Sequence, residues 1–414
     1  MSLPNSHVVD SCQICENRAL RSVLFLGYLP PVNQMWKIGT RPAEQPAYPA
    51  ELLVCGQCTL AQLGLVVDQK ILFPPEYPYT SGTTKILRDN FAELYAESRN
   101  YVPLTAQDLA VDIGSNDGTL LSNFKNGGHR VLGIEPTLMA NLANERGIPS
   151  MMRFFDSEAA RQAVAKEGQA KIVTATNVFA HIDAVHDIVK GILLLLKNDG
   201  AFISESHYFP SLLETLQYDT VYHEHLRYYS LHSLQYLFNA HGLEIFHAKK
   251  IPTHGGSIRV YAALKGVFPV RDTVSEILSE EIKAGISGAG LERFRERVSR
   301  SKLELYALLK EIKAKGGRVY GIGAPSRAST LINYVGLDDL IVEKVLEIKG
   351  SYKIGKYMPG TLIPVEEEAL LFEDQPEYAL LFSWHIAEEL IPKLRAKGYK
   401  GKFIVPLPNP KVVA

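Results

Sequence analysis

The chain has 414 residues, more than one hydrophobic core usually supports, so we expect two or three domains. A formal net charge of −1 gives no electrostatic reason to bind nucleic acid or an anionic membrane. The longest apolar run lies near "GILLLL" (191–196), far short of a membrane span, and no secretion signal is visible. We therefore expect a cytoplasmic protein without a nucleic-acid or membrane partner; its oligomeric state stays open.

The four cysteines fall in two pairs of identical spacing, "CQIC" and "CGQC". Two such pairs are typical of four thiolates around a structural zinc ion, with no open coordination position. Disulfides are less favoured without a secretion signal, and a redox pair would not need a second copy. The sequence thus predicts zinc bound by Cys12, Cys15, Cys55 and Cys58. Residues 1 to about 70 otherwise read as strand-poor and proline-rich, which predicts a lobe held by metal more than by a core.

An amphipathic helix is predicted at about 85–99, and the pattern then alternates between apolar runs and helix-length segments. Apolar runs at 109–115, 130–136, 171–179 and 201–208 predict a parallel sheet. A charged helical region at about 272–315 precedes a second unit of the same kind, which begins near "RVYGIGAPSRAS" (318–329). The predicted fold class is therefore α/β.

The stretch "LAVDIGSNDGTLL" (109–121) predicts a strand, a glycine-containing turn and a helix start. "GIEP" (133–136) follows about twenty residues later and places Glu135 to accept hydrogen bonds from ribose hydroxyls. The turn lacks the G-x-G-x-x-G pattern that admits a pyrophosphate. Its acidic and amide side chains suit a cationic or neutral ligand better than a phosphate, and the cationic S-adenosylmethionine fits that preference. The alternative is a plain strand–helix turn with an acidic cap.

The stretch "TVYHEHLRYYS" (220–230) places two histidines around a glutamate among tyrosines. It could be a half-buried segment whose polar groups satisfy one another, or a proton-transfer site with shifted pKa values. A zinc-protease helix is not indicated, because Arg227 stands where H-E-x-x-H needs its second histidine.

The loop "VYGIGAPSRAS" (319–329) has two glycines after a strand, but Ser326 stands where a dinucleotide fingerprint has its third. Arg327, in the first turn of the following helix, could meet a phosphate; a structural turn is equally compatible. His254 in "THGGSIR" could shape a pocket, although a tight turn explains its glycines as well. His207 and Tyr208 follow a predicted strand and are considered only as lining residues.

Together these motifs resemble the sugar C-methyltransferase family, whose members add a methyl branch to carbon 3 of nucleotide-linked 4-keto-deoxysugars. The resemblance covers nearly the whole chain, in the family's motif order: the two cysteine pairs, "YPYTSGT", "DIGSNDGTLL", "GIEP", "NVFAHI", "YHEHLRYYS", "HGGSIR" and "YGIGAPSRASTLINY". It implies a zinc-binding lobe at 1–75 and a Rossmann-like methyltransferase domain at 76–270. It also implies a helical linker and C-terminal α/β domain at 271–414 that helps to hold the sugar nucleotide.

The resemblance also assigns residues. Those expected to line the S-adenosylmethionine pocket are Asp112, Gly114, Asn116, Asp117, Glu135, Pro136 and Asn177. The polar active-site cluster would be Tyr77, His181, Tyr222, Glu224 and His225, with His254 and Arg327 near the substrate. Two departures fall in the C-terminal domain, where they affect the identity of the sugar and nucleotide. Arg327 replaces the lysine of an "ATAK"-like loop, and His385 stands where asparagine often occurs.

Methylation at carbon needs a proton to be removed beside a ketone, with donors for the resulting enolate. His225 can be the base, with Glu224 orienting it or balancing its charge, and Tyr222, Tyr77 and His181 can be donors. A tyrosine is the alternative proton acceptor. The alternatives are methylation of oxygen or nitrogen on a sugar nucleotide, and a non-catalytic nucleotide-sugar binding protein. A dehydrogenase is less favoured because neither glycine loop has the full fingerprint.

Overall fold

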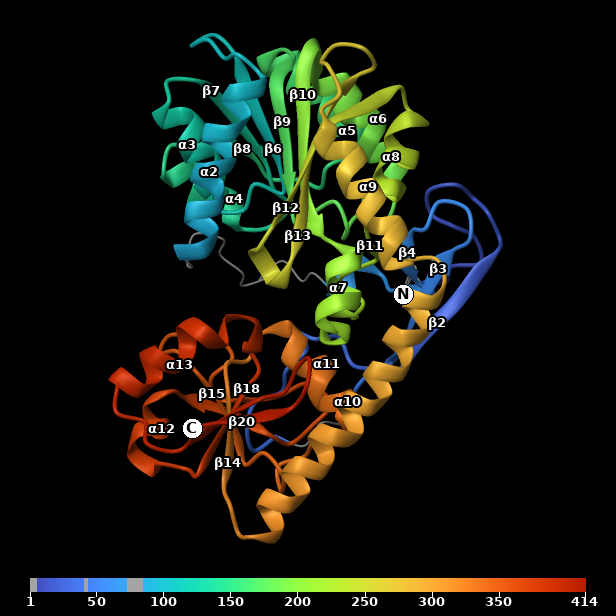
Figure 1. Ribbon diagram of the computed structural model, residues 1–414. Coiled ribbons are helices and arrows are strands. Elements are labelled where there is room, and N and C mark those ends of the chain that lie inside the picture. Colours follow the sequence, from blue (N-terminus) through green and yellow to red (C-terminus); the bar gives the residue numbers. More distant parts are fainter. Residues whose placement is uncertain (1–5, 41–43, 73–84) are drawn as a thin grey trace.

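The computed structural model describes residues 6–40, 44–72 and 85–414 and contains an N-terminal lobe, a central domain and a C-terminal domain (Figure 1). The predicted site residue Tyr77 lies outside the described residues. The long helix α10 (Ala289–Ala314) runs along one side of the molecule and, after α9 (Asp272–Ala284), connects the central domain to the C-terminal domain (Figure 1).

The N-terminal lobe contains more strand than the sequence led us to expect, and that prediction was wrong. Its antiparallel sheet has the order β11-β4-β3-β2, and β11 comes from the central domain. Buried residues of β2, including Leu24 and Leu29, belong to the same hydrophobic cluster as Leu305 and Leu331 of the C-terminal half. Because distant segments supply this core, the lobe looked poorly packed in isolation. Its elements are β1 (His7–Val8), β2 (Leu20–Leu29), β3 (Tyr48–Cys55), β4 (Ala61–Leu63), β5 (Leu65–Val66), α1 (Gln69–Leu72) and β11 (Arg227–Tyr228).

The central domain is a seven-stranded sheet of order β12-β13-β10-β9-β6-β7-β8 with helices on both faces (Figure 1). Only β13 is antiparallel to its neighbours. Its strands are β6 (Leu109–Ile113), β7 (Arg130–Ile134), β8 (Ser150–Met151), β9 (Ala170–Thr176), β10 (Leu196–His207), β12 (Leu243–Ile251) and β13 (Ser257–Leu264). Its helices are α2 (Lys85–Tyr101), α3 (Thr119–Asn126), α4 (Met139–Glu145), α5 (Ser157–Glu167), α6 (Val185–Leu195), α7 (Phe209–Thr215) and α8 (Leu231–Asn239).

The C-terminal domain has a second seven-stranded sheet, of order β16-β17-β15-β14-β18-β19-β20. Its five inner strands are parallel and each edge strand is antiparallel. Its elements are β14 (Val319–Ile322), α11 (Ser326–Val335), β15 (Lys344–Glu347), β16 (Lys356–Tyr357), β17 (Pro364–Glu367), α12 (Ala369–Asp374), β18 (Tyr378–Leu381), α13 (Ala387–Ala396), β19 (Lys402–Val405) and β20 (Lys411–Val413). The predicted α/β fold is confirmed.

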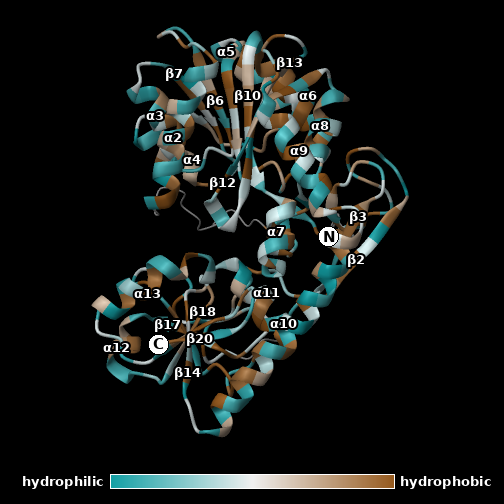
Figure 2. Cartoon of the chain, viewed as in Figure 1, coloured by the Kyte–Doolittle hydropathy of each residue, from teal (hydrophilic) through white to brown (hydrophobic). Residues whose placement is uncertain are grey.

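The apolar runs of the sequence explain these elements. All five residues of β6 are buried, as expected for a parallel strand covered on both faces. Helix α2 buries Leu87, Phe91 and Leu94, which share one face of a helix. Along α10, apolar and polar residues alternate in patches (Figure 2) because one side packs on the domains while the other faces solvent.

Candidate active site and zinc site

The loops after three neighbouring parallel strands meet at one edge of the central sheet. Asp112 lies in β6, and Gly114, Glu135 and Asn177 follow β6, β7 and β9. Since β6 lies between β7 and β9, this edge is where α/β sheets bind their ligands. The structure thus brings together the residues predicted to line an S-adenosylmethionine pocket.

The loop after β6 turns tightly and is tied to the loop after β7. Gly114 has φ +69°, and a Cβ there would lie 2.3 Å from Cγ2 of Val178. Asn116 has φ +48°, and its backbone N–H donates to Oε2 of Glu135 over 3.0 Å. Pro136 continues the second loop at the same edge, half-buried.

Two buried oxygens at this edge suit a cationic ligand. Oδ1 of Asn177 is buried and has no hydrogen-bond partner in the described part of the chain. Asp112 accepts from the hydroxyl of Thr174 over 2.6 Å, and burial raises the pKa of its carboxyl to about 7. The ammonium of S-adenosylmethionine can donate to the unpartnered oxygen, and its positive charges favour the ionised carboxylate, so these residues fit that cofactor.

Asp117 differs from its predicted place in the pocket lining. Its carboxylate accepts from the hydroxyl of Thr119 over 2.7 Å and from Arg146 over 2.8 Å. These contacts hold the first turn of α3, so the side chain shapes the loop from within.

The His225 ring lies at the centre of a buried aromatic cluster. Ring centroids of Tyr222, His207 and His181 lie 4.2, 4.7 and 5.0 Å from that of His225. His254 extends the cluster, with its centroid 5.6 Å from that of His207. The structure therefore brings together three of the predicted active-site residues and a histidine considered only as a lining residue.

The backbone fixes which nitrogen of His225 carries the proton. Nδ1 lies 2.9 Å from the carbonyl oxygen of Thr220, which can only accept, so Nδ1–H donates. Burial, followed by the charge of His181, holds the pKa of His225 well below its ordinary value. The neutral ring therefore has a lone pair on Nε2, as a proton acceptor requires.

His181 does not fit its expected role as a donor. Its Nδ1 donates to the backbone carbonyl of Glu224 over 2.5 Å, and burial lowers its pKa. A neutral imidazole has a single N–H, and the protein already uses it. His181 therefore has no further N–H to donate to an enolate oxygen. Burial raises the pKa of Tyr222 well above 10, so its hydroxyl stays protonated and can donate.

The backbone carbonyl of Thr220 contacts the His225 ring, and the carboxylate of Glu224 contacts the N-terminal lobe. Oε1 of Glu224 accepts from the amide of Asn33 in the N-terminal lobe over 2.7 Å. Oδ1 of Asn33 accepts from the hydroxyl of Tyr352 in the C-terminal domain over 3.1 Å. Glu224 thus joins all three parts of the molecule.

Arg327 also differs from the expectation that it meets a phosphate. Nε and Nη2 donate to the two carboxylate oxygens of Asp219 over 2.9 and 2.8 Å, and Nη2 also reaches Gln217 over 3.1 Å. Arg327 therefore joins the C-terminal domain to the central domain. His385 lies nearby, and burial, followed by the charge of Arg327, lowers its pKa to about 3.

His254 stands in a strained turn beside this junction. It has φ +56°, which is unusual for a residue other than glycine, and burial lowers its pKa to about 4. A Cβ on the following Gly255 would lie 2.6 Å from Oε1 of Gln217. Glycine is therefore favoured at position 255 for two reasons, the tight turn and the close packing against Gln217.

No sequence motif pointed to Thr220, Asp219 or Asn33 as contributors to the site. Thr220 acts through its backbone carbonyl, which any residue carries. Asn33 lies 191 residues before the glutamate it contacts. His385 was visible only as a departure from the family pattern.

The four cysteines meet in one cluster, with all sulfur atoms within 4.8 Å of one another. The two pairs have matching backbones. Glu16 and Thr59, which follow the pairs, have φ +58° and +57°, and their amides donate to the carbonyls of Cys12 and Cys55. Two matched turns that present four sulfurs fit a tetrahedral zinc ion.

The zinc lobe also supports the histidine cluster. Strand β4 pairs with β11, which begins two residues after His225. The hydroxyl groups of Thr59 and Ser230 lie 3.1 Å apart, close to the second cysteine pair. A metal ion in this lobe therefore stabilises one side of the active-site segment.

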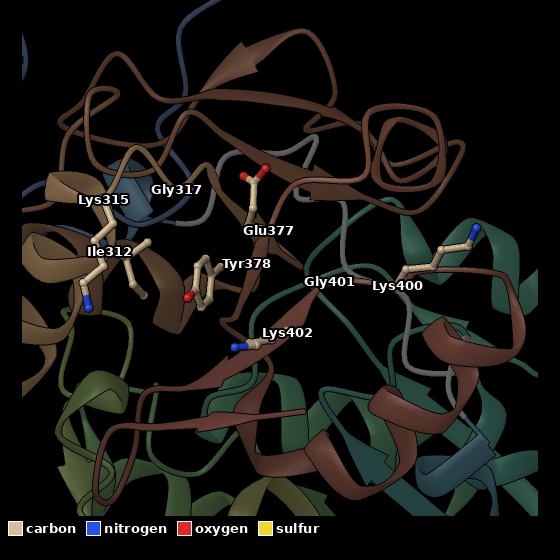
Figure 3. Close-up of a pocket in the computed structure, with 8 residues that line it drawn as sticks. All are labelled: Ile312, Lys315, Gly317, Glu377, Tyr378, Lys400, Gly401 and Lys402. Atoms are coloured by element: carbon tan, nitrogen blue, oxygen red, sulfur yellow. The ribbon is translucent and has the colours of Figure 1, made fainter.

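A separate cavity of about 380 Å³ opens in the C-terminal domain (Figure 3). Lys315, Glu377 and Lys402 lie along it, at the amino ends of β14, β18 and β19. Ligands of parallel sheets bind at the opposite edge, so this cavity is not part of the site described above. Among the described residues, no helix has both the length and the apolar character needed to cross a membrane.

Comparison with known proteins places these features in a family. Residues 12–73 match a family model for a zinc binding domain, residues 88–248 a methyltransferase domain, and residues 252–408 a C-methyltransferase C-terminal domain. The C-methyltransferase NovU of Streptomyces niveus is 32% identical over 410 residues, which cover 98% of this chain and 97% of NovU. The chain belongs to the C-methyltransferase family.

This C-methyltransferase uses S-adenosylmethionine as methyl donor and has a structural zinc site. Two solved structures with a methyltransferase-like fold are less similar. The PH0226 protein from Pyrococcus horikoshii OT3 is 15% identical with a TM-score of 0.37, covering 48% of this chain and 98% of that one. The magnesium protoporphyrin IX methyltransferase of Synechocystis PCC 6803, solved with S-adenosylmethionine, is 13% identical with a TM-score of 0.31, covering 43% and 78%. The family assignment depends on the full-length relative.

Removing one zinc ligand from this C-methyltransferase should weaken both the lobe and the active site. We expect Cys55→Ser to lose zinc, lower the melting temperature and reduce methyl transfer, because β4 would no longer hold β11. Metal content by mass spectrometry and thermal unfolding test this. Gln57→Ala, within the same turn but without a ligand atom, should keep one zinc ion per chain. Wild-type zinc content and stability in Cys55→Ser would contradict the assignment.

Proposed function

We propose that this C-methyltransferase adds a methyl group to carbon 3 of a nucleotide-linked 4-keto-deoxysugar through an enolate. The main support is the buried, neutral His225, whose Nδ1–H is taken by Thr220 and whose Nε2 can accept a proton. Carbon is a poor nucleophile until a proton beside a carbonyl is removed. Transfer to a hydroxyl also uses one base, but it needs no donor to an enolate oxygen, which Tyr222 can provide here.

In this proposal His225 takes the proton at Nε2, and the negative charge moves to the ketone oxygen. Tyr222 donates to that oxygen, because its raised pKa keeps the hydroxyl protonated. Bound S-adenosylmethionine supplies an electrophilic methyl group, and the buried surroundings keep water from protonating the enolate first.

We propose that the cofactor lies along the edge formed by Asp112, Gly114, Asn116, Glu135 and Asn177. Pro136 would then border the adenosine part. The fit of Asn177 and Asp112 to a cationic ligand supports this placement. Tyr77 is kept as a proposed member of the active-site cluster because of the family motif alone.

The nucleotide would lie against the C-terminal domain, between His254 and the loop after β14. In that loop the amide of Ala324 donates to Oε2 of Glu347, at the end of β15, over 2.9 Å. Asn116 and Glu135 are joined in the same way in the central domain. The same loop-to-glutamate hydrogen bond in both sheets supports a nucleotide site at this edge of the C-terminal sheet. Because Arg327 already binds Asp219, we assign the phosphates to backbone amides of the loop.

We propose domain boundaries at 1–75, 76–270 and 271–414. The second boundary follows β13, which pairs with β10 and β12 of the central sheet. The lobe and the C-terminal domain would then each contribute one wall to a site based on the central domain.

Product analysis with [methyl-¹³C]S-adenosylmethionine tests the function. Nucleotide-linked 4-keto-deoxysugars are incubated with the enzyme, and carbon–proton correlation spectra locate the new methyl group. We expect a methyl group on carbon 3. A methyl group on carbon 5, the other carbon beside the ketone, would correct the position. A methyl group on oxygen or nitrogen would contradict carbon methylation of these sugars.

Binding of S-adenosylmethionine should release a proton near neutral pH. Asp112 has its pKa raised to about 7, and a cationic ligand favours its ionised form. Affinity should therefore fall as pH drops below 7, by up to about tenfold per pH unit. Calorimetry in two buffers with different ionisation enthalpies measures the proton release. Asp112→Asn should bind more weakly without it, and unchanged release in that variant would contradict the role of Asp112.

A further inference from the structure

Asp219 is held from the C-terminal domain by three hydrogen bonds. Arg327 makes a two-pronged contact with its carboxylate, and Nε1 of Trp384 donates to Oδ2 over 2.7 Å. The Arg327 guanidinium also lies over the Trp384 ring, 5.0 Å from its centroid. Asp219 is 1% exposed and Arg327 6%, so each charge is stabilised mainly by the other and little by water.

Gln217 extends this contact toward the substrate side. Its Oε1 accepts from Arg327, and its Nε2 donates to the carbonyl of Gly255 over 2.6 Å. Gly255 adjoins His254, so one side chain links the C-terminal domain to the strained turn as well.

The segment that Arg327 and Trp384 contact contains Thr220, whose carbonyl binds the ring of His225. Asp219 lies in η2 (Tyr218–Thr220), a single turn of 3-10 helix whose last residue is Thr220. The amide and hydroxyl of Thr220 both donate to the carbonyl of Gln217, over 3.0 and 2.8 Å. The Thr220 carbonyl accepts from Nδ1 of His225 and from the hydroxyl of Tyr228, each over 2.9 Å. The direction of that carbonyl therefore follows the position of η2.

We infer that Arg327 and Trp384 are positioning residues for the base. By holding Asp219 they fix η2, and η2 fixes the Thr220 carbonyl that keeps His225 in its Nδ1–H form with Nε2 free to accept. The inference rests on the proposed role of His225. It makes docking of the C-terminal domain a condition for a competent base.

The guanidinium geometry matters for this role. A planar fork matches both oxygens of a carboxylate, whereas a lysine ammonium makes a point contact. Arg327→Lys would keep the positive charge near Asp219 but would lose the two-pronged contact, so η2 would be held less firmly. Trp384→Phe would keep an aromatic ring near the guanidinium and remove the N–H together with the five-membered ring that carries it.

The test is the tautomer of His225 in the free, zinc-loaded full-length enzyme. Long-range ¹H–¹⁵N spectra of ¹⁵N-histidine-labelled protein distinguish protonated from unprotonated ring nitrogens, and His225→Gln assigns the signals. We expect one form in the wild type, with Nδ1 protonated. Arg327→Lys and Trp384→Phe should give a mixture of both tautomers. Lys313→Met, which breaks an ion pair with Glu343 elsewhere in the C-terminal half, should match the wild type.

A single Nδ1–H form in both Arg327→Lys and Trp384→Phe would overturn the inference. This readout needs no substrate, so it stands apart from failure of the proposed sugar chemistry. In turnover, the two variants should lower kcat by about tenfold or more with KM nearly unchanged, since an imidazole base in the wrong tautomer loses most of its activity. A raised KM with unchanged kcat in Arg327→Lys would assign the guanidinium to the substrate instead and also overturn the inference.

Discussion

The structure depends on one buried segment, Leu216 to Ser230, which contacts all three parts of the molecule. Every residue in it is buried, although it contains two histidines, two carboxylates and an arginine. The N-terminal lobe pairs with it through β4 and binds Glu224 through Asn33. The C-terminal domain binds it through Arg327. The burial of Asp219 and Glu224 in this stretch is offset by hydrogen-bond partners that the neighbouring domains supply.

A second buried ion pair supports the cofactor edge. Arg259 of β13 donates to Glu205 of β10 over 2.6 Å and to Glu97 of α2 over 2.7 Å. The backbone carbonyl of Glu205 accepts from the backbone N–H of Asn177, whose side-chain Oδ1 is the unpartnered oxygen described above. Breaking one partner of a buried pair costs about 3–5 kcal/mol, so this network fixes α2 and the loop after β9 together. The buried charges thus lie in the ion pairs of Arg259 and Arg327, whereas His225, the proposed proton acceptor, is neutral.

Short-range patterns explain what the sequence could predict. The cysteine pairs, the glycine turn after β6 and Glu135 each depend on residues close in the chain, and the structure brings each group together. The contacts that modify the predicted roles are long-range. Arg327 lies 108 residues from Asp219, and the carbonyl of Thr220 has no sequence signature. The strands of the N-terminal lobe were missed for a related reason, because their core comes from the other end of the chain.

The central claim is that His225 removes a proton from the carbon that is later methylated. The most direct measurement is deuterium uptake from D₂O into a nucleotide-linked 4-keto-deoxysugar, without S-adenosylmethionine, for the wild type and His225→Gln. If His225 is the base, the wild type should introduce deuterium beside the ketone, and His225→Gln should lose that uptake while it still binds S-adenosylmethionine. Equal uptake with both enzymes would contradict this role of His225, as would methylation at carbon by His225→Gln at the wild-type rate.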